Sequence, residues 1–149
     1  MKGVAGAAPD SPARPLLLSV PMAVHIVRLG TPRSPNEGLR IGTVRRPPRG
    51  VPRTRYAVDD WYDTWLPALS PSPDLLKAGL AADTPKQWGV FMKRFRAEMA
   101  RPDASHLLDL LAALSRKANF AVGCYCEDES RCHRSVLRTL LQERGAALV

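Results

Sequence analysis

Apolar residues recur at helical spacing in the second half of the chain. Trp88, Phe91, Phe95 and Met99 fall three or four positions apart, which predicts a helix over residues 85–100. The residues that precede this stripe favour a helix start there. Thr84 is a suitable N-cap, Pro85 fits the first helical position, and Gln87 completes a capping box.

A second helix is predicted over residues 104–117, with Asp103 as its cap. Its expected buried stripe is made of five leucines: Leu107, Leu108, Leu110, Leu111 and Leu114. The last helical pattern begins near Cys132 and places four apolar residues on one face: Val136, Leu137, Leu140 and Leu141. A shorter helix or turn is predicted over residues 74–80.

Three short apolar runs that are rich in β-branched residues predict strands. They cover residues 22–29 (MAVHIVRL), residues 39–44 (LRIGTV) and residues 120–122 (FAV). The order is therefore strand, strand, mixed region, helix, helix, strand, helix. This order predicts an α/β fold: a single domain over residues 22–149 with a mainly parallel sheet flanked by helices, as in three-layer Rossmann-like proteins.

The first 21 residues differ from the rest of the chain. They are rich in Ala, Pro and Gly and show no period, so we expect a disordered extension or a mis-assigned start, with Met22 as the alternative first residue. No apolar run approaches the roughly 20 residues that span a bilayer, so we expect no membrane contact. The three cysteines are odd in number and close together, which favours a reduced, cytoplasmic protein over a secreted one.

The net charge of +8 is unevenly distributed. Residues 1–55 hold ten Lys or Arg against two acids, whereas the remainder is balanced. The basic excess predicts a partner that carries phosphate: a small anionic ligand, or nucleic acid as an alternative. A merely solvated basic surface is the other interpretation. The pattern carries no information on the oligomeric state.

Residues 45–55 (RRPPRGVPRTR) form the most basic part of that excess. Three prolines and a glycine exclude a helix interior, so we predict a stiff loop that leaves the second strand. Arginine suits bidentate recognition of phosphate, which makes Arg45, Arg46 and Arg49 candidate ligand-binding residues. The next stretch, residues 56–69, holds four aromatic residues that we expect in the core, and three acids, Asp59, Asp60 and Asp63, that could pair with the preceding arginines.

All three cysteines lie in residues 119–144 (NFAVGCYCEDESRCHRSVLRTLLQER), where a strand ends and a helix begins. Free N–H groups at a helix start favour anions, and they lower the pKa of a nearby thiol. We therefore predict a cysteine-dependent catalytic site that binds an anion, without a bound cofactor. Its candidate nucleophiles are Cys126 and Cys132, its candidate acid–base groups Glu127 and His133, and its fixed positive charge Arg134.

The same residues allow other interpretations. Zinc would be held by Cys124, Cys126, Cys132 and His133, although adjacent side chains at a helix start are expected to diverge. Cys126 and Cys132 could form a redox pair, and Cys126 with Arg131 has the Cys-x4-Arg spacing of a sulfur-transferase loop. Alternatively, the cysteines pack as small apolar residues and carry no chemistry.

Two segments resemble a known family, domain of unknown function 488, which includes YeaO-like proteins. Gly38 to Gly50 (GLRIGTVRRPPRG) is similar to its Gly-Tyr-Arg strand with a following Arg-x-x-Pro-Arg-Gly, but lacks the usual tryptophan. Gly123 to Leu137 (GCYCEDESRCHRSVL) is similar to the Cys-x-Glu…Cys-His-Arg signature of one branch; Cys124 is not part of that signature. The resemblance covers roughly residues 22–145. It implies an α/β fold and a shared site, without a reaction.

Overall fold

The structure is a computed structural model, and it describes residues 22–149. The predicted disorder of residues 1–21 lies outside the described residues. The strands are β1 (Val24–Arg28), β2 (Leu39–Gly42), β3 (Thr64–Trp65) and β4 (Phe120–Cys124). The helices are α1 (Pro73–Leu80), α2 (Pro85–Met99), α3 (Pro102–Leu114) and α4 (His133–Glu143), with short 3-10 turns η2 (Arg53–Arg55), η3 (Pro67–Leu69) and η4 (Glu129–Arg131).

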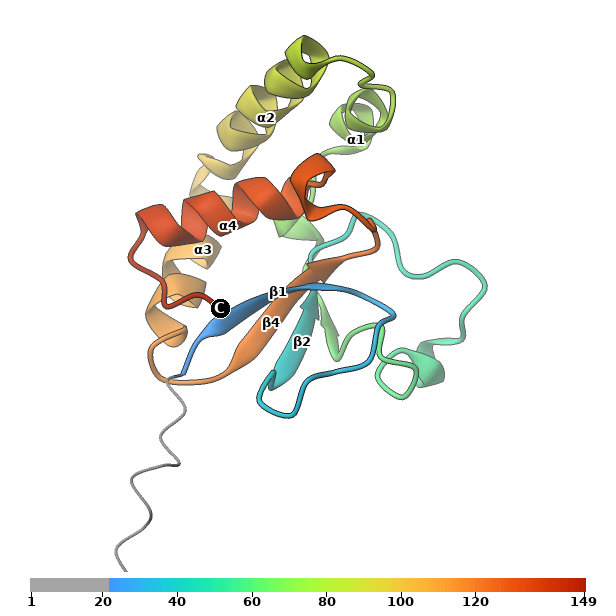
Figure 1. Cartoon of the computed structure of the whole chain (residues 1–149), viewed down its shortest axis with the longest axis vertical. Coiled ribbons are helices and arrows are strands. Elements are labelled where there is room, and N and C mark those ends of the chain that lie inside the picture. The colour runs from blue at the N-terminus through green and yellow to red at the C-terminus, as the bar shows by residue number, and fades with distance from the viewer. Residues whose placement is uncertain (1–21) are drawn as a thin grey trace, which may run out of the picture.

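The strands form one parallel sheet in the order β1-β4-β2-β3 (Figure 1). The last strand in sequence, β4, therefore lies between the first two and pairs with both. Arg28 of β1 is in register with Cys124 of β4, and Gly42 of β2 is in register with Gly123. The three strands consequently end at one edge of the sheet. The predicted α/β domain with a parallel sheet is confirmed.

One large apolar cluster joins the helices to the sheet. The buried apolar side chains of the four α-helices belong to it, together with Val24, Ile41, Phe120 and Val122 of the strands. Figure 1 shows the helices gathered together, with the loop that follows β2 projecting away from them. Side chains alternate between the two faces of a strand, and the helices pack against the strand residues that point to one face of the sheet.

The opposite sheet face is covered by non-helical chain. A Cβ atom on Gly42 would lie 2.5 Å from the Tyr62 ring, and one on Gly123 would lie 2.6 Å from Leu29. Glycine at these two strand positions therefore lets Tyr62 and Leu29 pack directly on the backbone. The Rossmann-like pattern predicts a third layer on this face of the sheet. In the described residues that layer consists of irregular chain, and the helices pack on the opposite face.

Helix α2 agrees closely with the sequence pattern. Thr84 caps it, Gln87 completes the capping box, and the four predicted apolar residues are all buried. Helix α3 differs in two ways. It starts at Pro102 with Arg101 as N-cap, and Asp103 lies in its first turn instead of capping it. Leu110 and Leu114 were expected in the buried stripe but are exposed. Leu110 lies about 200° around the helix from Leu108, so one face cannot bury both.

A buried ion pair ties the loops around β2 to the sheet. Arg40 in β2 is 1% exposed, and its guanidinium donates to both carboxylate oxygens of Glu37. The remaining donors reach the backbone carbonyls of Thr31 and Asp60. Every part of this buried charge has a partner, as burial of a charge requires.

The acids of residues 56–69 are used partly as predicted. Asp59 pairs with Arg55 of the preceding loop, as expected. Asp60 and Asp63 instead pair with Arg33, which lies in the earlier loop between β1 and β2. Of the four aromatic residues, Tyr62 is buried, Tyr56 and Trp61 are partly buried, and Trp65 is 43% exposed on the edge strand β3. The expectation of core packing therefore holds for Tyr62 and is wrong for Trp65.

Candidate functional site at the carboxyl edge of the sheet

A cavity of about 710 Å³ opens where β1, β2 and β4 end. The segments that follow these strands line it, because parallel strands in register deliver their next residues to the same edge. Four arginines line it: Arg28, Arg45, Arg46 and Arg49. No Asp or Glu among residues 22–149 is part of the lining. Arginine side chains therefore form part of the cavity wall, and no carboxylate of the described residues lies beside them there.

The arginines of this wall are held in different ways. Arg45 donates to the carbonyls of Ser70 and Pro71, which fixes its guanidinium against the chain before α1. Arg28 donates to the carbonyl of Tyr125. Arg46 and Arg49 are exposed, and the backbone carbonyl of Arg46 accepts a hydrogen bond from the Tyr125 hydroxyl. The basic loop is thus connected to the residue that lies between two of the cysteines.

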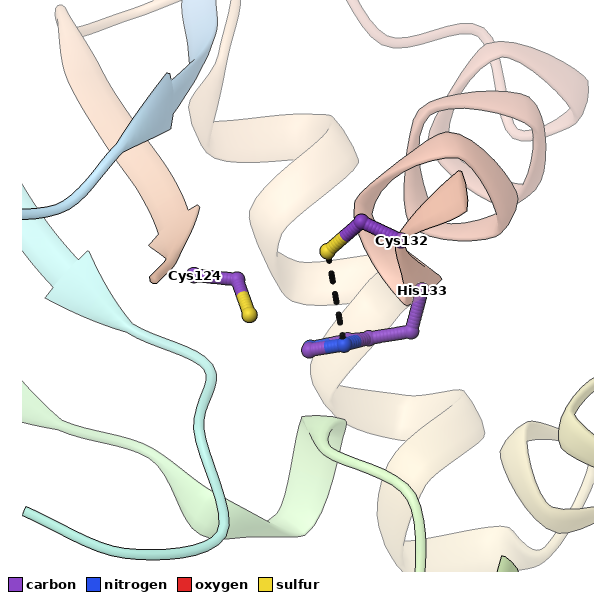
Figure 2. Close-up of side chains that lie close together, drawn as sticks. All are labelled: Cys124, Cys132 and His133. Atoms are coloured by element: carbon purple, nitrogen blue, oxygen red, sulfur yellow. Dashed lines mark hydrogen bonds between the residues drawn. The ribbon is translucent and has the colours of Figure 1, made fainter. Parts of the chain in front are cut away.

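The thiols form the reactive part of the same cavity. Cys124, at the end of β4, and Cys126 both line it, and their sulfur atoms are 3.8 Å apart. Cys132 is buried as the N-cap of α4, and its sulfur lies 3.8 Å from Nδ1 of His133. All three cysteines are free thiols. Figure 2 shows Cys124 facing Cys132 and His133 across the gap between β4 and α4.

The expected divergence of Cys132 and His133 is wrong. Cys132 has an extended backbone (φ −130°, ψ 150°) because it precedes the first helical residue. Its side chain therefore does not follow the 100° step that separates neighbours within a helix. It turns back toward the His133 ring, and the two side chains lie together instead of on different faces.

His133 is one of the most constrained residues of the site. It is 5% exposed, its Nε2 lies 2.6 Å from the carbonyl oxygen of Thr43, and its ring packs edge-on against Phe95. A carbonyl only accepts hydrogen bonds, so Nε2 carries the proton in this contact. In the neutral ring, Nδ1 is then left with a free lone pair on the side of Cys132.

Arg134 stands behind the thiols. It is 3% exposed and donates through Nη2 to the carbonyl of Cys126, while its Nε has no hydrogen-bond partner within the described part of the chain. Among residues 22–149, no carboxylate lies within ion-pair distance of it. A buried guanidinium without a carboxylate calls for negative charge from another source, and the thiol cluster is adjacent.

The three thiols perturb one another. Hydrogen bonds from Cys124 and Cys132 lower the pKa of Cys126; burial opposes this, and the charge of Arg134 adds to it. The same contact with Cys126 raises the pKa of Cys124, as do Cys132 and burial. The pKa of Cys132 is lowered first by Cys124 and then by His133. The cluster therefore stabilises negative charge on the sulfur atoms of Cys126 and Cys132, and Cys124 is the thiol that donates hydrogen bonds to them.

The acids of the loop between β4 and α4 are occupied elsewhere. Asp128 accepts from Ser130, and Glu129 pairs with Arg138 of α4. Glu127 is exposed and is not among the residues that line the cavity. The acid–base role predicted for Glu127 remains a prediction.

The structure brings most of the predicted site residues together. Cys126, His133, Arg45, Arg46 and Arg49 line the cavity, while Cys132 and Arg134 lie directly behind it. The sulfur-transferase interpretation does not fit, because Arg131 donates to the carbonyl of Ala82 and lies over the Trp88 ring. Sequence reasoning missed Arg28 and Trp61 as lining residues. Arg28 ends the first strand, and the parallel register was the signal that could have placed it beside β4.

This arrangement defines a class of protein: a parallel α/β domain with a basic, thiol-lined site at the carboxyl edge of its sheet. The family model DUF488-N3a, described as the active DUF488-N3 subclade, matches residues 24–145. The chain therefore belongs to the domain of unknown function 488 family, which confirms the resemblance. The description calls the subclade active and names no reaction. No curated protein and no solved structure matches the chain in these comparisons.

None of the described helices is both long enough and apolar enough to cross a bilayer. The cytoplasmic location, the redox pair of Cys126 and Cys132, and the nucleic-acid partner remain predictions.

Proposed function

We propose that this protein binds a small phosphate-bearing molecule in the cavity at the carboxyl edge of the sheet and acts on it through Cys126. One observation carries the proposal: four arginines and two thiols line the cavity, and no acidic residue from the described residues 22–149 lies among them. A wall of that kind attracts an anion, and guanidinium groups match the oxygens of a phosphate in a bidentate way.

The size and the apolar part of the cavity support a ligand larger than phosphate alone. About 710 Å³ falls within the range of sites for small organic molecules, which is roughly 300–1,000 Å³. Leu29, Trp61 and Leu76 line it beside the charged residues. A ligand with one flat or apolar part and one phosphate part, such as a nucleoside monophosphate, meets both kinds of wall.

The chemistry assigned to Cys126 is nucleophilic displacement. Its thiolate sulfur forms a bond to an electrophilic atom of the ligand, while the leaving group departs with its bonding electron pair and takes up a proton from the solvent. Water then breaks the new bond, giving its hydroxyl group to the ligand fragment and its other proton to the solvent. The balance is hydrolysis, and the thiolate is restored.

Binding is tested by calorimetric titration with adenosine monophosphate, inorganic phosphate and adenosine at constant ionic strength. We expect saturable binding of the two phosphate-bearing probes and weaker binding of adenosine. Arg49→Ala should lower the affinity for adenosine monophosphate about tenfold, because a charge-assisted hydrogen bond is lost. Arg101→Ala is the matched control, since Arg101 is also exposed but lies at the start of α3, outside the cavity lining.

The position of Cys126 is tested by alkylation with iodoacetamide, mapped by mass spectrometry. Saturating adenosine monophosphate should protect Cys126, because the cavity that it lines is then filled. Equal affinity of Arg49→Ala and the parent protein, or alkylation that the ligand does not slow, would contradict the proposal. Binding of a single-stranded oligonucleotide that weakens steeply with salt, without binding of the small probes, would instead favour the nucleic-acid alternative.

A further inference from the structure

Three potential metal ligands converge at the wall of the cavity. The sulfur atoms of Cys124 and Cys132 and a ring nitrogen of His133 all lie within 4.8 Å of one another, and all three residues are buried. Cys124 comes from the end of β4, and Cys132 and His133 come from the start of α4; Figure 2 shows the three side chains directed toward the space between these elements. We propose that Cys124, Cys132 and His133 form a zinc site.

The distance between the ligand atoms of Cys132 and His133 agrees with this assignment. Ligands on a tetrahedral zinc, with Zn–S near 2.3 Å and Zn–N near 2.0 Å, lie roughly 3.5–3.8 Å from one another. The Cys132 sulfur is 3.8 Å from Nδ1 of His133. Because Nδ1 carries no proton, only the thiol could donate a hydrogen bond here, and 3.8 Å is long for such a bond. Two thiolates and an imidazole are soft to intermediate ligands, and they select zinc over magnesium or calcium.

The orientation of His133 supports the same conclusion. A metal-binding histidine typically donates its other ring N–H to a carbonyl or carboxylate, which fixes the tautomer and aims the lone pair. Here Nε2 lies 2.6 Å from the buried carbonyl of Thr43, and Nδ1 faces Cys132. The ring is therefore held as a ligand before any ion arrives.

Arg134 supplies a second, independent observation. Its guanidinium is buried, its Nε lacks a partner among the described residues, and its Nη2 binds the carbonyl of Cys126. A buried polar group without a partner indicates a place where an ion, a water or a ligand binds.

Three protein ligands leave the fourth position of a tetrahedral zinc open, as in catalytic sites. Cys124 and His133 both line the cavity, so the open position faces it. The site would thus place a metal ion beside the ligand and beside Cys126. The zinc assignment stands on the three ligands alone and does not depend on which molecule occupies the cavity.

The first experiment is elemental analysis of tag-free protein, purified under reducing conditions and dialysed with zinc. We expect stoichiometric zinc in the parent protein and its loss in Cys132→Ser and His133→Ala. Cys126→Ser is the matched control, because it removes a neighbouring thiol but none of the three ligands, and it should keep its zinc. Circular dichroism establishes that each variant is folded.

A second measurement needs no variant. Cobalt(II) added to metal-free protein should give intense thiolate-to-metal bands in the near ultraviolet and the visible bands of a tetrahedral ion. Bound zinc should also protect Cys124 and Cys132 from iodoacetamide, and a chelator should remove that protection. The proposal would be overturned if the parent protein took up neither zinc nor cobalt. It would also be overturned if folded Cys132→Ser retained its zinc. Loss of zinc from Cys126→Ser to the same extent would overturn the open fourth position.

These outcomes are separable from those of the proposed function. Arg49→Ala touches the cavity wall but no zinc ligand, so it should weaken binding of adenosine monophosphate and leave the zinc content unchanged. If zinc is absent but the phosphate-bearing probes still bind, the metal site fails alone. If zinc is present and the probes do not bind, the proposed function fails alone.

Discussion

Two arginines in the part of the chain that the structure describes are almost fully buried, and their surroundings differ. Arg40 is 1% exposed, and its charge meets both oxygens of Glu37 and two backbone carbonyls. Arg134 is 3% exposed, meets one carbonyl and leaves its Nε without a partner among residues 22–149. The first charge is balanced inside the fold. The second has no ion-pair partner among those residues and lies beside the sulfur atoms of the site.

The largest effect on stability is expected from the buried ion pair of Arg40 and Glu37. Glu37→Ala leaves the Arg40 charge buried and unpaired, so the free energy of unfolding should fall by about 3–5 kcal/mol. Urea denaturation measures it, and Glu37→Gln, which keeps an acceptor oxygen, should lose less. Glu127→Gln, at an exposed carboxylate, is the control and should leave stability unchanged. Unchanged stability of Glu37→Ala would show that the pair does not hold the loops.

The next effect separates the two arginines by function. Arg134→Met should raise the pKa of Cys126 and slow its alkylation at mildly acidic pH roughly tenfold, because the charge of Arg134 contributes to lowering that pKa. The pH dependence of alkylation by iodoacetamide, mapped by mass spectrometry, measures it. Arg40→Met should destabilise the fold and leave the reactivity of Cys126 in the folded protein unchanged. Equal reactivity of Cys126 in Arg134→Met and the parent protein would show that Arg134 does not stabilise a thiolate.

The smallest effect concerns the partly exposed charges near Arg40. Asp63 accepts from Arg33 and from the backbone N–H of Arg40, so Asp63→Asn should cost about 1–2 kcal/mol in urea denaturation. Asp59→Asn, in the exposed pair with Arg55, is the matched control and should show no detectable change. An equal response of the two variants would mean that the contacts of Asp63 are as weak as those of a surface pair.

The same carboxylate should make stability depend on pH. Burial raises the pKa of Asp63, but its contacts with Arg33 and the Arg40 N–H lower it by more, so the pKa is below its ordinary value. The folded form then binds this proton less readily than the unfolded form. Its contribution is complete above about pH 4 and is lost as the pH falls through the lowered pKa. Asp63→Asn should therefore narrow the difference in stability between neutral and acidic pH.

Local sequence signals predicted the elements that they control directly. The capping box of Thr84 and Gln87 fixes the start of α2, and the turn from β4 into α4 was recognised from its apolar runs. Strand β3 was not predicted, because Thr64–Trp65 is too short to show a period and exists only through its pairing with β2. The exposure of Leu110 likewise depends on which face of α3 meets the core, a tertiary property.

The candidate site also divides into features that local sequence signals predicted and features that depend on tertiary contacts. The cysteines and the basic loop were recognised as a site because each is unusual in sequence. Their meeting in one cavity depends on the parallel register of β1, β2 and β4, which adjacent residues do not encode. The convergence of Cys132 and His133 depends on the extended backbone of an N-cap, and the partner of His133 is a backbone carbonyl that carries no sequence signature.

The central place of β4 has a consequence for how the chain folds. β1 and β2 lie on either side of β4, so neither has its main strand partner until residues near the C-terminal end are available. Closing such distant segments costs chain entropy before any contact compensates for it, which slows folding. The strand that completes the sheet is also the strand that carries Cys124. The thiols are therefore enclosed in the same step that closes the sheet. Until β4 pairs with β1 and β2, the thiol groups of all three cysteines remain accessible to solvent.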